Sequence, residues 1–313
     1  MRSLSNRSIV TFGMAVILAM LGSTTRAVVA QSLPPYEAPR TANDHPDLNG
    51  FWQALNTANW DIEEHGAAPG PYSELLGGYA SQPPGFSIVE GGELPYTPEA
   101  REMKQQRFEN RLVHDPMFYG GPQGELEDLS DPEAKCFLGG GLVRGHYMPF
   151  PSQIIQGKDK VIIAYQFGSG FRVIHMTEGT DQDLEATIDA RTLDNDVWLG
   201  RSAGRWDGDT LVVKTIGPYY RSVTLDRAGN FMSPEAHIVE RYTPISPYHL
   251  RYEATIEDPE TFTRPVTVSF PLYRIVEQPN MELLEFQCVP FVEEFMYGEL
   301  RDEKRTYPEG TEL

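Results

Sequence analysis

Residues 198–215, WLGRSAGRWDGDTLVVKT, constrain the fold of this chain more than any other segment. Two strand-like runs flank Asp207-Gly208-Asp209, and an Asp-Gly pair between such runs predicts a hairpin because glycine tolerates positive φ. In an extended first arm, alternate residues share one face. That face would carry Trp198, Gly200, Ser202, Gly204 and Trp206. Two indoles around three small residues predict a shallow trough that a backbone or a small ligand could approach.

The N-terminus has the pattern of a secretory signal peptide over residues 1–30. Arg2 and Arg7 precede an apolar run at 9–21 that is too short to span a bilayer, and small residues precede a cleavage site at Gln31. A membrane anchor is the alternative. We expect a periplasmic or secreted protein with no membrane insertion after the signal is removed.

Charge narrows the range of partners. Removing the signal peptide takes away three arginines and lowers the formal net charge from −19 to −22. Nucleic acids and anionic membrane surfaces need clustered lysine and arginine, so neither is expected as a partner. We expect a small-molecule ligand or substrate, and the sequence does not predict an oligomeric state.

The mature chain has two cysteines, Cys136 and Cys288. In an oxidising compartment such a pair predicts one disulfide that closes a long loop. Two buried thiols are the alternative. The disulfide would tie the middle of the chain to its last expected strand.

Residues 31–135 are expected to form an irregular N-terminal wrap with one helix at about 98–113. Thr97 suits the N-cap of this helix and Pro98 its first position. The remainder, 136–313, reads as about nine short strands separated by turns. These are 153–156, 160–167, 171–176, the two arms of the hairpin, 237–243, 249–257, 266–275 and 283–289.

The strand pattern predicts a mainly β fold. Residues 249–257 alternate apolar and polar side chains, as a half-buried antiparallel strand does. An antiparallel meander would form a barrel-like body of the lipocalin or calycin kind, or else a sandwich. With the wrap, it would make one globular unit.

Several segments together carry a family resemblance: 46–67, 131–156, 204–215, 226–243, 252–266 and 283–300. With them the chain resembles a widespread family of secreted bacterial β-rich proteins of unknown function. The resemblance covers nearly all of the mature chain and implies secretion and a β-rich fold, but no reaction. Against the family pattern this chain differs at Gln166, Arg201, Ala203, Met232, Ser233, Pro234 and Val266. The differences imply a site near the hairpin that is altered or specialised.

Motifs of the common metal- and nucleotide-binding enzymes are absent from the sequence. It contains no HExxH, CxxC, P-loop or dinucleotide fingerprint, so we expect no cofactor. No two of the seven histidines stand two or four residues apart, so no local metal site is expected either. A metal site assembled from distant histidines is the alternative.

Ionisable residues within the expected strands are the candidates for chemistry. Glu240 shares its parity with Ile238 and Tyr242, which places it inside the barrel if they pack inward. A buried carboxylate needs a cation or hydrogen-bond donors, and Arg144 and Arg172 are the candidate partners. The pair would either brace the barrel or serve as an acid–base group beside an anion holder.

Two histidines complete the proposed catalytic set, because the pKa of histidine lies near neutral pH. Each has a structural role as its alternative. The catalytic candidates are His146, His175 and Glu240, and the substrate-binding candidates are Arg144, Arg172, Arg201, Trp198, Trp206 and Tyr220. We expect a cofactor-independent lyase, isomerase or hydrolase that acts on a small organic molecule. A lipocalin-like carrier for an apolar or aromatic molecule and an envelope-assembly role are the alternatives.

Overall fold

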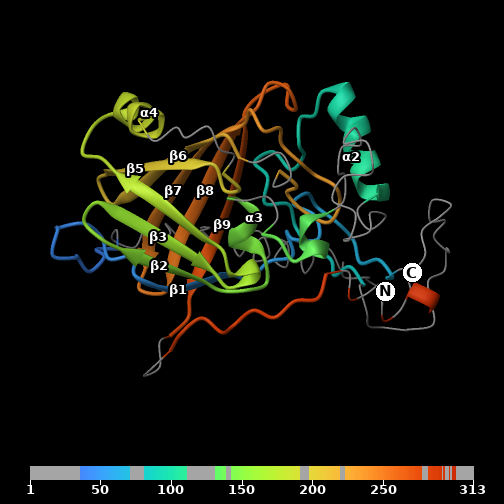
Figure 1. Ribbon diagram of the computed structural model, residues 1–313, viewed down its shortest axis with the longest axis horizontal. Helices are drawn as coiled ribbons and strands as arrows, with labels where there is room; N and C mark the ends of the chain where they lie inside the picture. The colour runs from blue at the N-terminus through green and yellow to red at the C-terminus, as the bar shows by residue number, and fades with distance from the viewer. Residues whose placement is uncertain are drawn as a thin grey trace, which may run out of the picture. The chain divides into compact units, whose positions relative to one another are not determined.

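Nine strands of the chain close into one barrel, in which consecutive strands are neighbours (Figure 1). The expected barrel-like fold is therefore confirmed, and the sandwich alternative is not. The strands are β1 Gly50–Ala54, β2 Ser152–Gln156, β3 Lys160–Tyr165, β4 Phe171–Met176, β5 Arg201–Asp207, β6 Thr210–Ile216, β7 His237–Ser246, β8 His249–Glu257 and β9 Val266–Arg274.

This computed structural model describes residues 36–70, 81–110, 131–138, 142–190, 197–218, 223–276 and 281–290, with 292, 296 and 298–300. The predicted signal peptide and Tyr220 lie outside these ranges. No helix within them is long and apolar enough to cross a membrane.

The predicted hairpin is present, and β5 and β6 pair with Asp207 opposite Thr210. Gly208 in the turn has φ +58°, the conformation that favours glycine. The first arm is shorter than expected. Gly200 already has φ +66°, so Trp198 and Gly200 precede the strand and do not share a face with Ser202.

The strand that closes the barrel comes from the expected wrap. β1 pairs with β2 on one side and with β9 on the other, both antiparallel. Residues 283–289, expected as the last strand, are irregular instead. The closed barrel has no free edge with which they could pair.

One neighbouring pair is parallel, which corrects the expected all-antiparallel meander. β4 and β5 run in the same direction, and a parallel pair needs a crossover connection. That connection contains the helix α4, Asp181–Asp189, which was not predicted. The sequence signal for α4 is a capping box, in which Thr180 and Asp183 exchange hydrogen bonds. Leu184 and Ile188 of α4 pack on Ala203, whose side chain is fully buried.

The described ranges contain two further helices besides α4. The predicted helix is α2, Pro98–Asn110, and Thr97 caps it by accepting a bond from Ala100 N at 3.2 Å; residues 111–113 lie outside the described chain. The short α3, Arg144–Tyr147, is buried and adjoins β1. The 3-10 turns within the described residues are η1 Pro132–Lys135, η2 Phe167–Ser169 and η4 Gly298–Leu300.

The predicted disulfide between Cys136 and Cys288 is present. It joins the chain after η1 to the irregular segment that follows β9, not to a strand. A disulfide is compatible with a secreted or periplasmic protein.

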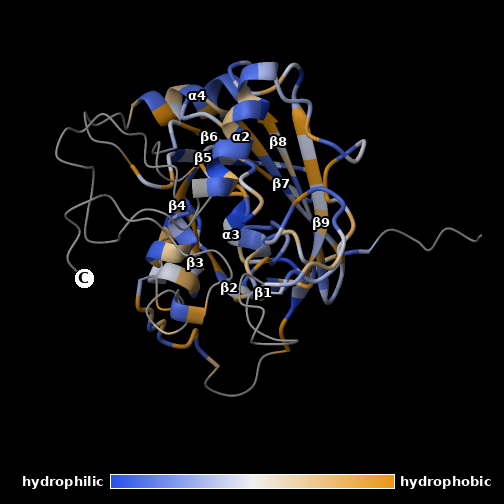
Figure 2. Cartoon of the chain, turned by 90° about the vertical axis from the view of Figure 1, so that its right-hand side faces the viewer, coloured by the Kyte–Doolittle hydropathy of each residue, from blue (hydrophilic) through white to orange (hydrophobic). Residues whose placement is uncertain are grey.

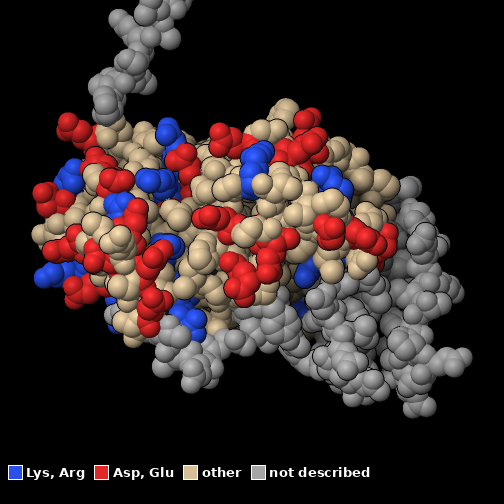
Figure 3. All heavy atoms as spheres, turned by 90° about the horizontal axis from the view of Figure 1, so that it is seen from above, with Lys and Arg blue, Asp and Glu red and all other residues tan. Residues whose placement is uncertain are grey.

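The barrel wall follows the expected alternation. Apolar and more polar residues alternate along β9 (Figure 2), and the inward ones are buried. Acidic side chains are spread over the described face shown in Figure 3, in keeping with the strongly negative charge of the sequence.

Candidate functional site

Inside the barrel lies a buried polar group that we call the interior cluster. It comprises Arg172, Glu240, His146, Tyr165, Tyr242, Tyr252, Ser202 and Thr215, all buried. At its centre the guanidinium of Arg172 on β4 holds the carboxylate of Glu240 on β7. Arg172 Nη1 donates to Glu240 Oε1 at 3.0 Å, and Nη2 donates to Oε2. The expected pairing of a buried Glu240 with an arginine is therefore confirmed, and of the two candidates Arg172 is the partner.

Further hydrogen bonds satisfy both members of the pair. The hydroxyls of Tyr242 and Tyr252 each donate to Glu240 Oε1 at 2.9 Å. Arg172 Nε donates to Ser202 Oγ at 2.9 Å, and Arg172 Nη2 donates to Thr215 Oγ1 at 2.7 Å. Of the small residues that predicted a trough, Ser202 binds Arg172, and a Cβ at Gly204 would meet Ile174 and Met176. A neighbouring backbone atom, Ile216 O, approaches Gly200, which the prediction allowed.

The interior cluster keeps Glu240 ionised. Burial by itself would raise the pKa of Glu240, but the charge of Arg172 and its hydrogen bonds to the carboxylate hold this pKa well below its usual range. A carboxylate with so low a pKa is a weak base. Its geometry suits bracing of the barrel better than proton transfer.

The hydrogen bonds of His146 are less complete than those of Glu240. Its Nε2 lies 2.8 Å from the hydroxyl oxygen of Tyr242, whose proton goes to Glu240. That oxygen therefore accepts from Nε2–H, which leaves a lone pair on Nδ1. Among the described residues, Nδ1 of His146 has no hydrogen-bond partner, and neither has the hydroxyl of Tyr165. Burial lowers the pKa of His146 and raises that of Tyr165 to about 12, so both are neutral near pH 7.

Arg144 belongs to a separate network. It donates to both carboxylate oxygens of Asp131, at 2.7 and 3.0 Å, to Glu133 at 2.6 Å and to Asn59 at 2.8 Å. Glu133 also binds Arg227. Burial opposes its ionisation, yet the charges of Arg227 and Arg144 lower the pKa of Glu133 to about 2. Arg144 is thus paired with the carboxylates of Asp131 and Glu133. The structure does not bring Arg144 to Glu240.

The other sequence candidates are scattered. His175 lies on β4 with the parity opposite to Arg172, and Arg201 is half-buried at the start of β5. Trp198 Nε1 donates to Leu138 O at 2.8 Å, near the disulfide. The ring of Trp206 stacks on His45, with 4.8 Å between centroids. None of the four joins the interior cluster.

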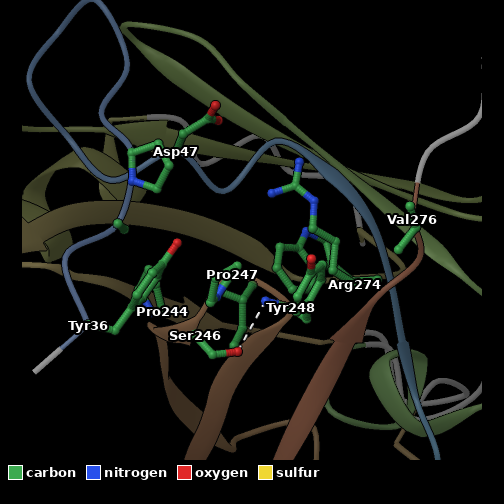
Figure 4. Close-up of a pocket in the computed structure, with 12 residues that line it drawn as sticks. Tyr36, Asp47, Pro244, Ser246, Pro247, Tyr248, Arg274 and Val276 are labelled. Carbon is green, nitrogen blue, oxygen red and sulfur yellow. Dashed lines mark hydrogen bonds between the residues drawn. The ribbon is translucent and has the colours of Figure 1, made fainter. Parts of the chain in front are cut away.

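A pocket of about 290 Å³ opens at one end of the barrel (Figure 4), and we call it the mouth pocket. Three segments far apart in the sequence build it: the chain before β1, the β7–β8 turn and the end of β9. Its walls include Tyr36, Ala38, Pro39, Asp47, Trp52, Pro244, Pro247, Tyr248, Leu250 and Arg274. Trp52 and Leu250 are almost fully buried and provide an apolar base.

The mouth pocket lies close to the interior cluster. Leu250 and Tyr252 are two residues apart on β8 and face the same way, with about 7 Å between their Cα atoms. Tyr252 bonds Glu240, so a lining residue of the pocket and a member of the cluster are neighbours on one face of β8.

The sequence predicted none of the residues that line the mouth pocket. The only local signal is the Ser246-Pro247-Tyr248 turn, which by itself indicates a loop and no site. As for metals, no group of three or more histidine, cysteine or acidic side chains in the described chain is arranged to hold an ion.

Comparison with known proteins adds no assignment. No protein-family model matches the chain, and no curated protein is significantly similar to it. The resemblance to secreted bacterial proteins therefore stays a prediction.

Proposed function

We propose that this is a periplasmic or secreted protein that binds a small apolar or aromatic molecule in the mouth pocket. The proposal rests on a contrast between the mouth pocket and the interior cluster. The mouth pocket is open above buried Trp52 and Leu250, whereas the interior cluster is occupied by paired side chains. The volume of the mouth pocket, about 290 Å³, is at the lower end of the range for ligand-binding cavities.

Filling the mouth pocket is expected to weaken ligand binding. Ala38 lines the pocket, so Ala38→Phe places a ring in the space that a ligand would take. We expect the neutral fluorescent probe N-phenyl-1-naphthylamine to bind one per chain to the parent protein. In Ala38→Phe its Kd should rise at least about tenfold, since the apolar contact is lost. Fluorescence titration measures both.

Ala42→Phe is the matched control, because Ala42 is exposed in the same segment and does not line the pocket. It should bind the probe as the parent does. Equal probe binding by the parent and Ala38→Phe, or no saturable binding by the parent, would contradict the proposal.

His146 supports a second candidate function. In this alternative the protein is a cofactor-independent lyase, isomerase or hydrolase whose base is Nδ1 of His146. The specific observation is the lone pair on Nδ1, which no described residue satisfies although Nε2 is held by Tyr242. A substrate would reach it past Leu250, from the mouth pocket. A neutral imidazole in such a position is a suitable general base.

Metabolite profiling tests this alternative. Purified protein is incubated with a bacterial culture extract, and products are followed by mass spectrometry. If His146 is the base, His146→Gln should slow product formation by about 10²-fold or more. His237→Gln, at an exposed histidine, should leave it unchanged. Absence of any product with the parent protein would rule out this function and leave binding.

A further inference from the structure

We propose that the ligand of the mouth pocket carries a carboxylate on its apolar body and that Arg274 holds this carboxylate. The inference rests on the proposed binding function and adds the chemical class of the ligand. It follows from three features of the pocket: the position of Arg274, the engagement of Asp47 and the apolar base.

Arg274 is the last residue of β9 and lines the pocket. Its Cζ lies 5.6 Å from the centroid of the Trp52 ring, and its guanidinium extends toward the pocket in Figure 4. A guanidinium has five in-plane N–H donors, so it can hold a carboxylate together with a protein partner. Its planar fork matches the two oxygens of a carboxylate.

A cationic ligand fits the pocket less well. The indole face of Trp52 would attract a cation, but the guanidinium of Arg274 already occupies that position. Asp47 is the acidic group in the wall, and its Oδ1 accepts bonds from Asn49 N at 3.0 Å and Asn49 Nδ2 at 2.7 Å. These two donors offset part of its charge. A cationic ligand would also meet the charge of Arg274, so this wall disfavours a cation.

The body of the ligand would be apolar. Besides Trp52 and Leu250, the walls present the rings of Pro39, Pro244 and Pro247. Flat, rigid surfaces of this kind suit an aromatic or alicyclic group, which loses little conformational entropy on binding. The predicted class is thus a small aromatic or alicyclic carboxylic acid.

Three indole derivatives that differ in charge test the class. Indole-3-acetate is an anion, indole-3-acetamide its neutral analogue and tryptamine a cation. Each competes with N-phenyl-1-naphthylamine in a displacement titration at pH 7. We expect indole-3-acetate to bind at least about tenfold more tightly than the amide, as one charge-assisted pair implies, and tryptamine to bind most weakly.

Variants then assign the carboxylate to Arg274. Arg274→Gln should remove the preference for indole-3-acetate over the amide while the neutral probe still binds. Arg251→Gln is the matched control, since Arg251 is an exposed arginine on the adjacent β8. Arg251→Gln should retain the preference for indole-3-acetate over the amide, although its net charge is the same as that of Arg274→Gln. Asp47→Asn should strengthen binding of indole-3-acetate by a few-fold, because it removes a repelling charge from the wall.

The outcomes separate the two proposals. If the probe binds but the amide or tryptamine equals or exceeds indole-3-acetate, the carboxylate inference is overturned and the binding function stands. The same holds if Arg274→Gln and Arg251→Gln behave alike. If neither the probe nor any indole derivative binds the parent protein, both proposals fail.

Discussion

Glu240→Gln is expected to lower the free energy of unfolding by about 3–5 kcal/mol, which is the usual cost of removing one partner from a buried ion pair. The change keeps the size of the side chain and removes its charge. Arg172 would then be a buried guanidinium without a carboxylate, although Ser202 and Thr215 would still accept two of its hydrogen bonds. For a domain with a typical stability of about 5–15 kcal/mol, this is a large share.

Urea unfolding followed by tryptophan fluorescence measures the effect. Glu253→Gln is the matched control: Glu253 lies on the outer face of β8, opposite Arg241 on β7. The same chemical change there should cost less than about 1 kcal/mol, because Glu253 lies outside the buried interior. Similar losses in the two variants would show that Glu240 does not brace the barrel.

A double variant separates loss of the pair from loss of packing. Arg172→Met with Glu240→Met removes both charges, so it should cost less than the sum of the two single variants. It should not fully recover, because the hydroxyls of Tyr242 and Tyr252 lose their acceptor. Should Glu240→Gln fail to fold, Tyr252→Phe removes one donor to Glu240 and should cost about 1 kcal/mol.

Asp61→Asn is expected to stabilise the protein at pH 8 by roughly 2–4 kcal/mol and to have little effect below about pH 4. Asn230 Nδ2 donates to Asp61 Oδ1 at 2.9 Å and to Asp226 Oδ2 at 2.6 Å, so the two carboxyls lie close together. Burial raises the pKa of Asp226, and the charge of Asp61 raises it further, to about 7. Burial raises the pKa of Asp61 as well.

The sign of the effect follows from proton binding. An aspartate whose folded-state pKa is raised from 3.8 to about 7 holds its proton more tightly in the folded protein than in the unfolded chain. The stability that this aspartate contributes is fully present below its unfolded-state pKa. It is lost as the pH rises through the folded-state pKa. Asparagine at position 61 removes the repelling charge, and its amide oxygen can still accept from Glu63 N.

Unfolding free energies at several pH values between 4 and 8 measure this effect. The lowered pKa of His146 makes the parent gain stability over part of the same range, so the informative quantity is the difference between variant and parent. The unfolding free energy of Asp61→Asn minus that of the parent should increase from pH 4 to pH 7. Asp159→Asn, at an exposed turn residue, should give a flat difference. A flat difference for Asp61→Asn would contradict the coupling of the two carboxyls.

Strand parity predicted the side of the barrel wall for Glu240 but not its partner. Arg144 and Arg172 were equal candidates in the sequence. In the structure β4 and β7 are separated by β5 and β6, and Arg172 reaches Glu240 across the interior. A period of two specifies the face of a strand and carries no information about what faces it across the barrel.

The mouth pocket had no local sequence signal that indicates a binding site. Tyr36, Trp52, Leu250 and Arg274 are spread over most of the chain, and each has an ordinary residue type for its segment. Their proximity depends on β1 closing the barrel beside β9. For the same reason, the sequence did not predict that His146 would join the interior cluster while Trp198 and Trp206 make contacts elsewhere.

By itself, the sequence determined the β5–β6 hairpin, the alternation of β8, the start of α2 and the cysteine pair, because turn chemistry, side-chain period and helix caps act over a few residues. Only the tertiary structure decided which strand closes the barrel, which arginine meets Glu240 and where a pocket forms. Those outcomes depend on contacts between residues far apart in the chain, and short-range patterns do not encode them.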